Sequence, residues 1–234
     1  MRSSCDFSKN EAIMKQVFLL VLFMQVLEIN AQQSIKYLAL GDSYTIGESV
    51  SSHKSFPHQL AKELALIWGD SIETTVAAKT GWRTDELIQA IETFPDLQAK
   101  YDLVSLLIGV NNQFQGRPFQ QYEFEFQTLL NQSIDLAGGD NAKVVVISIP
   151  DYYYTPFGVA NRTESVSSEL NKYNSYAQEL CDSLDILFVN ITDISRNGIK
   201  YSAYIADDGL HPSAEQYAIW VAKILYLIKD EKRN

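Results

Sequence analysis

The sequence has little cysteine and little histidine, which limits the stabilisation and the chemistry that it supports. It contains two cysteines and three histidines in 234 residues. Cys5 lies in an N-terminal segment that we expect to be removed, which leaves Cys181 without a partner for an internal disulfide. A disulfide-stapled fold is therefore excluded, and Cys181 is expected to be a small buried side chain.

Positive charge is also scarce. Lysine and arginine number 19 against 29 aspartates and glutamates, which gives a formal net charge of −10. Such acidity disfavours nucleic acids and anionic membrane surfaces as partners. No glycine-rich, phosphate-cradling loop opens a helix, and no internal repeat or low-complexity tract is present. With 46% hydrophobic residues, the chain supports a single domain with one substantial core.

One long apolar run stands near the N-terminus, in residues 17–29. It follows Lys15 and is followed by Ala31, a small residue of the kind found at signal-peptidase cleavage sites. The run is short for a membrane span, which needs about 20 apolar residues. Glu28 also interrupts it. These features are typical of a secretory signal.

We therefore predict that residues 1–31 are a signal peptide, cleaved after Ala31, and that residues 32–234 form the mature domain of a secreted or periplasmic protein. A permanent membrane anchor is the less favoured alternative. Met14 is a second candidate for the start of translation, because a conventional signal begins at that residue.

Strand-like and helix-like segments alternate along the mature chain, which is the pattern of βαβ units around a parallel sheet. The predicted fold class is therefore α/β. The predicted strands are residues 35–40, 72–76, 103–108, 143–149 and 186–190, and the predicted helices are residues 56–68, 84–92, 120–137, 166–184 and 213–229. Thr84 is the expected cap of the second helix.

A serine flanked by turn-forming residues follows the first predicted strand, in Gly41-Asp42-Ser43. Ligands of an open parallel sheet bind outside the carboxyl ends of its strands, so Ser43 is placed where chemistry is expected. Taken alone, the tripeptide is more simply a turn. A serine hydroxyl is also a poor nucleophile at neutral pH without a base, so the hypothesis that Ser43 is a nucleophile requires one.

His211 is the best candidate for that base. It lies beyond the last predicted strand, and Asp208 precedes it by three positions. This spacing lets one loop place a carboxylate against imidazole Nδ1 while Nε2 faces the serine. Asp207 is the local competitor for Asp208. His53 and His58 are weaker candidates for the base, since one lies in a polar loop and the other in the first turn of a helix.

Acyl transfer also needs hydrogen-bond donors for the developing oxyanion. Three donors stand at the ends of predicted strands: the backbone N–H of Ser43, the backbone N–H of Gly81 and the side-chain amide of Asn111. Each has a simpler structural explanation, because Gly81 suits a turn and Asn111 suits a loop that satisfies its own backbone. Their occurrence together favours the catalytic interpretation.

These segments resemble a known family. In chain order, Gly41-Asp42-Ser43, Gly81, Gly109-Val110-Asn111 and Asp208-Gly209-Leu210-His211-Pro212 are similar to the four blocks of the SGNH (GDSL) esterase and lipase superfamily. The resemblance implies a flavodoxin-like three-layer α/β/α sandwich with a five-stranded parallel sheet. It also implies Ser43, His211 and Asp208 as catalytic residues, an oxyanion hole from Ser43, Gly81 and Asn111, and no metal or organic cofactor.

Two residues depart from the family pattern. Tyr44 stands where leucine is common, and Asn112 stands where aspartate commonly follows the asparagine. Neither change removes a catalytic group. A classical α/β-hydrolase is excluded, because no Gly-x-Ser-x-Gly elbow is present and the candidate serine follows the first strand of the domain.

Aromatic side chains gather in the loops that are expected at the same edge of the sheet. They are candidates for lining a substrate pocket, although aromatic loop residues often pack on their own domain. The candidates are Trp82, Phe114, Tyr152, Tyr153, Tyr154 and Phe157.

The sequence therefore predicts a secreted serine esterase that forms an acyl-enzyme on Ser43, with carbohydrate O-acyl (acetyl) esters as one class of substrate. Alternatives among enzymes are a lysophospholipase, a short-chain lipase, a thioesterase or an O-acyltransferase on the same scaffold. A non-catalytic flavodoxin-like binding module is the alternative from another class. The expected partner is a small-molecule, glycan or lipid ester, with no nucleic acid and no stable membrane anchor.

Overall fold

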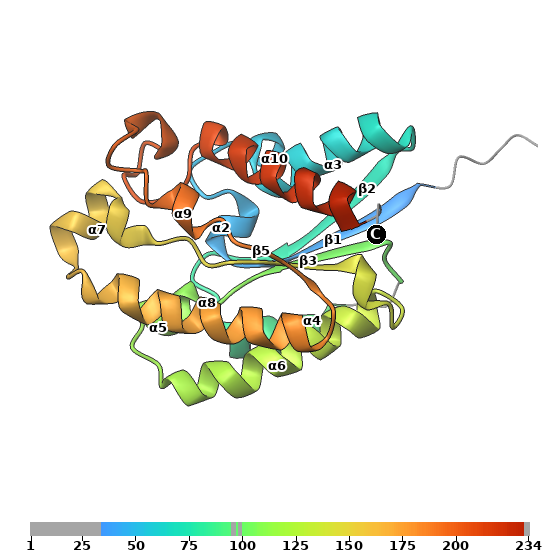
Figure 1. The fold of residues 1–234 in the computed structure, drawn as a ribbon, viewed down its shortest axis with the longest axis horizontal. Helices are drawn as coiled ribbons and strands as arrows, with labels where there is room; N and C mark the ends of the chain where they lie inside the picture. The colour runs from blue at the N-terminus through green and yellow to red at the C-terminus, as the bar shows by residue number, and fades with distance from the viewer. Residues whose placement is uncertain (1–33, 95–96, 98–99, 232–234) are drawn as a thin grey trace, which may run out of the picture. The chain divides into compact units, whose positions relative to one another are not determined.

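The apolar segments pair into one parallel sheet in the computed structural model (Figure 1). The structure describes residues 34–231 except 95–96 and 98–99, so the predicted signal peptide lies outside the described residues. The strand order is β2-β1-β3-β4-β5, with every neighbouring pair parallel. The strands are β1 (Ile35–Gly41), β2 (Ile72–Ala78), β3 (Leu103–Leu107), β4 (Val144–Ile147) and β5 (Leu187–Val189).

Helices cover both faces of this sheet, so the predicted three-layer α/β/α fold is confirmed. Figure 1 shows α3 and α10 on one face and α4, α6 and α8 on the other. The long helices are α3 (Phe56–Trp68), α4 (Thr84–Thr93), α6 (Phe119–Leu136), α8 (Ser165–Ser183) and α10 (Ala214–Glu231). Between two helical layers, all five residues of β3 are buried, as expected for a parallel strand covered on both sides.

Short helices occupy many of the connections, and the sequence patterns missed them because a single turn has no apolar period. The α-helical turns are α2 (Ser43–Ile46), α5 (Val110–Phe114), α7 (Pro156–Asn161) and α9 (Thr192–Ser195), and the 3₁₀ turns are η1 (Ser52–Lys54), η2 (Asn141–Lys143), η3 (Tyr152–Tyr154) and η4 (Ser202–Tyr204). Two of them, α2 and α5, directly follow strands β1 and β3 at the carboxyl edge of the sheet.

An aromatic cluster joins α3 to α10. Trp220 and Tyr217 of α10 are fully buried and pack against Phe56, each with a ring-centroid separation of 6.3 Å. Burial of three such rings stabilises the contact between the two helices, and their tilted geometry adds to this stabilisation. The start of α10 is fixed in this way, and with it the loop that ends at His211.

Cys181 and Thr84 bear on two details of the predicted fold. Cys181 is a free thiol with 0% exposure, which confirms the prediction of a buried small side chain. The predicted cap at Thr84 is wrong, because Thr84 is the first residue of α4 and its N–H is bonded to the side chain of Asn112. In the described part of the chain, no helix has the length and apolar character to cross a membrane.

Gly41 brings the end of β1 into close contact with its surroundings. A Cβ at this position would overlap the side-chain oxygen of Thr45 in α2 and the carbonyl oxygen of Leu107 in β3. Only glycine allows β1, β3 and the turn of α2 to approach so closely. This contact seats the first turn of α2, which begins with Ser43, directly on the end of the sheet.

Candidate active site

Ser43 lies at the first position of α2, where β1 ends. Oδ1 of the Asp42 carboxyl group caps this turn by accepting a hydrogen bond from the N–H of Tyr44 at 3.0 Å. The N–H of Ser43 itself has no hydrogen-bond partner among the described residues. The turn therefore presents the hydroxyl and the N–H of the same residue at the carboxyl edge of the sheet.

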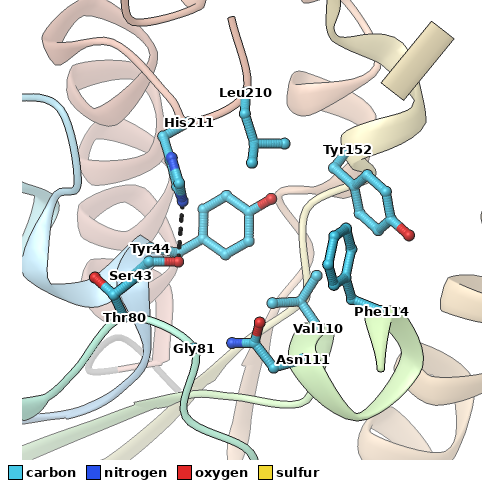
Figure 2. A pocket seen from close by; sticks show the side chains of 10 residues that line it. All are labelled: Ser43, Tyr44, Thr80, Gly81, Val110, Asn111, Phe114, Tyr152, Leu210 and His211. Atoms are coloured by element: carbon cyan, nitrogen blue, oxygen red, sulfur yellow. Dashed lines mark hydrogen bonds between the residues drawn. The ribbon is translucent and has the colours of Figure 1, made fainter. Parts of the chain in front are cut away.

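His211 and Asp208 complete a hydrogen-bonded chain with this serine. His211 Nε2 lies 3.0 Å from Ser43 Oγ, as the dashed line in Figure 2 marks. His211 Nδ1 lies 2.6 Å from Asp208 Oδ2. Both distances are within hydrogen-bond range. The structure thus brings together the three residues that the sequence predicts as catalytic, from segments 168 positions apart.

The loop between Asp208 and His211 is held by its own carboxylate. Asp208 Oδ1 accepts hydrogen bonds from the N–H groups of Leu210 and His211, each at 2.9 Å. Gly209, at φ +74, adopts the left-handed conformation that the turn requires. The carboxylate therefore fixes both the imidazole ring and the backbone that carries it.

Ser49 is a contact of this site that sequence reasoning missed. Its hydroxyl donates to Asp208 Oδ2 at 2.6 Å, and its backbone has a φ of 64°. Partial burial by itself raises the pKa of the Asp208 carboxyl, but the hydrogen bonds from Ser49, His211 and the backbone outweigh it and lower the pKa to about 2. Asp208 therefore stays ionised at neutral pH. Nothing in the polar loop around Ser49 marks it in the sequence.

The other candidates for the base and for its carboxylate partner are not part of this hydrogen-bonded chain. Asp207 is exposed, and no hydrogen bond between it and His211 is found in the described chain. His58 Nδ1 pairs with Ser55 Oγ at 3.1 Å, and His53 is exposed on η1. Neither of these two histidines contacts Ser43 within the described residues.

The predicted oxyanion donors Gly81 and Asn111 line the same pocket as Ser43 (Figure 2). The N–H of Gly81 has no hydrogen-bond partner among the described residues, and its φ of +83° is one that favours glycine. Asn111 Nδ2 donates to the carbonyl of Trp82 at 2.9 Å. A side-chain amide nitrogen carries two hydrogens, so a second donor remains on Asn111.

The loop that carries Gly81 is tied to α5 by side-chain amides. Gln115 Nε2 donates to the carbonyl of Gly81 at 3.2 Å, next to the bond from Asn111 to Trp82. Asn112 then accepts from the N–H of Thr84 at 3.1 Å. Two amides of α5 and the amide of Gln115, the residue that follows it, therefore hold the backbone of this loop and the start of α4.

Asn112, where aspartate is common in the resembling family, makes two hydrogen bonds to Thr84. It is 0% exposed, and its Nδ2 also donates to Thr84 Oγ1 at 2.6 Å. Thr84 Oγ1 in turn donates to Glu125 of α6. The threonine hydrogen is thus committed to Glu125, and the hydroxyl oxygen needs a donor, which an amide supplies and a carboxylate does not.

The pocket beside Ser43 is small, with a volume of about 150 Å³, and largely apolar. Its wall away from the hydrogen-bonded chain is formed by Tyr44, Val110, Phe114, Tyr152 and Leu210. Of the aromatic residues considered from the sequence, Phe114 and Tyr152 line it. Trp82, Tyr153, Tyr154 and Phe157 do not, and Phe157 instead packs behind Phe114 at a centroid separation of 6.3 Å.

The carboxyl of Asp42, next to Ser43 in the chain, has a different environment from that of Asp208. It is 0% exposed, and its Oδ2 has no hydrogen-bond partner in the described chain. Burial raises the pKa of Asp42 from its ordinary value of 3.8 to about 7, against the lowering effect of the Tyr44 N–H. One site thus contains two carboxyl groups with opposite shifts.

No group of three or more His, Cys, Asp or Glu side chains is arranged to hold a metal ion in the described part of the chain. The polar groups around Ser43 are instead arranged for proton transfer and for hydrogen bonding to an oxygen.

The model of the GDSL-like Lipase/Acylhydrolase family matches residues 39–219 of the chain. These residues run from the strand before Ser43 into the helix after His211. No curated protein matches the sequence.

Several solved structures share this fold. A lipase from a goat rumen metagenome has 16% sequence identity and a TM-score of 0.67, over 82% of this chain and 97% of that one. A variant of an acetyl xylan esterase from Geobacillus stearothermophilus has 19% identity and a TM-score of 0.65, over 83% and 94%. A lipase/acylhydrolase from Enterococcus faecalis has 22% identity and a TM-score of 0.63, over 84% and 96%.

Replacing Asn112 with aspartate should destabilise the protein. Asn112→Asp removes the donor to Thr84 Oγ1 and buries a second carboxylate near Glu125, so we expect the free energy of unfolding to fall by about 2–4 kcal/mol. Urea denaturation measures this change. Adding Glu125→Gln should recover part of the loss, because the threonine hydroxyl is then free to donate to the new carboxylate. If the loss of unfolding free energy in the double variant equals the sum of the losses in the two single variants, this hydrogen-bond arrangement is contradicted.

The burial of Asp42 should make stability fall as the pH rises from about 4 to about 7. In that window the folded protein keeps a proton on Asp42 that the unfolded chain has lost, so raising the pH favours unfolding. The shift corresponds to a loss on the order of 4 kcal/mol, which Asp42→Asn should abolish.

Urea denaturation of both proteins at several pH values measures this difference. Asp208, whose pKa is lowered to about 2, adds stability above pH 4 and loses it only as the pH falls below that value, so its effect lies in another window. Equal pH slopes for the two proteins between pH 4 and 7 would show that Asp42 is ionised in the folded state.

Proposed function

The chain belongs to the GDSL-like lipase/acylhydrolase family and is an ester-bond hydrolase, and from this we propose that it is a secreted serine esterase that removes small acyl groups, of the acetyl class, from a polar alcohol such as a carbohydrate. The proposal names Ser43 as nucleophile, His211 as base and Asp208 as its partner. The observation that carries it is a small apolar pocket directly beside the Ser43–His211 hydrogen bond.

Acylation begins with Ser43 Oγ, which attacks the ester carbonyl as His211 Nε2 takes its proton across the 3.0 Å contact. The negative charge that develops on the carbonyl oxygen is stabilised by the unpartnered N–H groups of Ser43 and Gly81 and by the second hydrogen of Asn111 Nδ2. His211 then gives its proton to the leaving alcohol oxygen, and the acyl group stays on Ser43.

Deacylation repeats these steps with water as the nucleophile. His211 takes a proton from water, the hydroxide adds to the acyl carbon, and the acid leaves as Ser43 recovers its proton. Asp208 holds the histidine in the tautomer whose Nδ1–H donates to the carboxylate, at 2.6 Å, and stabilises the imidazolium form in both half-reactions.

The size of the pocket supports a small acyl group. At about 150 Å³ it is smaller than the roughly 300–1,000 Å³ of pockets that enclose drug-sized ligands. A long fatty acyl chain needs a longer apolar channel than this wall encloses, which argues against a lysophospholipase. The same fold carries an acetyl xylan esterase in Geobacillus stearothermophilus, so the scaffold accommodates hydrolysis of small acyl esters of a glycan.

Secretion is part of this proposal and rests on the apolar run of residues 17–29 with Ala31 after it. The protein recovered from the medium or the periplasm of an expressing cell should begin at Gln32 when its N-terminus is sequenced. An exported protein that retains residues 17–29 would indicate an anchor instead.

Ester hydrolysis should depend on Ser43 and fall with acyl length. We expect kcat/KM for p-nitrophenyl acetate to exceed that for the hexanoate by at least about tenfold, because the longer chain outgrows the pocket. Ser43→Ala should reduce kcat at least about 10³-fold and abolish labelling by a fluorophosphonate probe.

Ser52→Ala and His53→Ala are the matched controls, since both residues lie on η1 and neither side chain is hydrogen-bonded to Ser43, His211 or Asp208 in the described chain. They should keep full activity and labelling, whereas His211→Ala should lose nearly as much activity as Ser43→Ala. Undiminished hydrolysis by the Ser43 variant overturns the mechanism. A preference for the hexanoate overturns the small-acyl specificity while leaving the mechanism intact.

A further inference from the structure

Tyr44, next to the candidate nucleophile, forms the inner wall of the pocket. Its ring lies edge-on to the imidazole of His211, with a centroid separation of 5.5 Å and an interplanar angle of 60°. Figure 2 shows the ring extending from Ser43 toward Tyr152, with the hydroxyl beneath Leu210. Only 3% of the residue is exposed, so the ring is held firmly in this position.

The hydroxyl of Tyr44 has no hydrogen-bond partner among the described residues. Its oxygen is not among the fully enclosed polar atoms without a partner, which in the described chain include Tyr217 Oη and Asp42 Oδ2. The other tyrosine of the wall, Tyr152, donates its hydroxyl to Gln113 at 2.8 Å. Tyr44 therefore supplies the one unpaired hydroxyl that faces the apolar part of this pocket in the described structure.

An unpaired hydroxyl in such a place discriminates between ligands. In the free enzyme, water that enters the pocket satisfies it. A ligand that displaces the water without replacing its hydrogen bond loses affinity. A ligand whose own oxygen accepts that hydrogen bond keeps its affinity. Burial also raises the pKa of Tyr44 well above its usual value, so the group stays a neutral donor.

The acyl part of the ester is the part that meets this hydroxyl. The carbonyl oxygen must face Gly81 and Asn111, and the leaving oxygen must lie at His211 Nε2. Of the two remaining substituents, a sugar is too large and too polar for an apolar pocket of about 150 Å³. A short acyl group fits and points along the ring of Tyr44.

We propose that Tyr44 is a specificity-determining residue, whose hydroxyl favours short acyl groups that carry a hydroxyl on the second or third carbon over apolar acyl groups of the same length. This inference rests on the proposed function and names the acyl class within it. An acetyl group is short enough to leave the water on Tyr44 in place. A propionyl or butyryl group displaces that water, and a lactyl or 3-hydroxybutyryl group replaces it.

The test compares matched esters of one alcohol. For wild type, kcat/KM should be higher for the lactyl than for the propionyl ester, and higher for the 3-hydroxybutyryl than for the butyryl ester, in at least one of the two pairs. Tyr44→Phe keeps the ring and removes the hydroxyl, so the ratio of hydroxylated to plain ester should fall about tenfold. The ratio compares two substrates of one protein and is independent of the folded fraction.

Tyr152→Phe is the matched control. It removes a hydroxyl of the same wall that already has a protein partner, so the ratio should stay at the wild-type value. A ratio that is unchanged in Tyr44→Phe, or a wild-type ratio of one or less in both pairs, overturns this inference. Both results require measurable, Ser43-dependent hydrolysis by wild type, so they are distinct from a failure of the proposed function, in which Ser43→Ala keeps the activity.

Discussion

The hydrogen bond between His211 and Asp208 is the interaction on which the rest of the site depends. Its 2.6 Å length places the imidazole so that Nε2 meets Ser43 Oγ at 3.0 Å. The same carboxylate accepts the backbone N–H groups of Leu210 and His211 and the hydroxyl of Ser49. One side chain therefore orders its own loop, the imidazole of His211 and the loop that follows Ser43. The buried aromatic contacts of α10 hold the C-terminal end of the loop that contains Asp208 and His211.

The two carboxyl groups closest to the proposed nucleophile in the chain and in the hydrogen-bonded site, Asp42 and Asp208, have opposite environments. Asp208 is partly exposed, has four donors and stays ionised, so it stabilises positive charge on His211. Asp42 is enclosed, its Oδ2 has no partner in the described chain, and burial raises its pKa to about 7. A second full negative charge next to Ser43 would oppose the negative charge that forms on the reacting carbonyl oxygen. By raising the pKa of Asp42, burial thus reduces that charge near neutral pH at the expense of stability.

The proposed oxyanion donors are positioned by amides from α5 and from Gln115, the residue after it. Gln115 and Asn111 bind the carbonyl groups of Gly81 and Trp82, and Asn112 binds the N–H of Thr84 at the start of α4. These bonds occupy the carbonyl groups of Gly81 and Trp82 and the N–H of Thr84, whereas the N–H of Gly81, a residue that lines the pocket, has no partner among the described residues. Asparagine at position 112 also matches the commitment of the Thr84 hydroxyl to Glu125. The asparagine at position 112 is therefore explained by the contact between Thr84 and α6 as well as by its own bonds to Thr84.

The sequence by itself determined the sheet, the long helices and the residues to examine, because apolar periodicity and the residue types at strand ends are local properties. Helix α3 was predicted at its observed bounds, and Ser43, Gly81, Asn111, Asp208 and His211 were named from their places in the chain. Contacts between distant segments needed the tertiary structure. Ser49 contacts Asp208 across 159 positions. Only the folded chain shows that, among the described residues, the hydroxyl of Tyr152 has a partner and that of Tyr44 has none. Such partners depend on three-dimensional proximity, which no local pattern encodes.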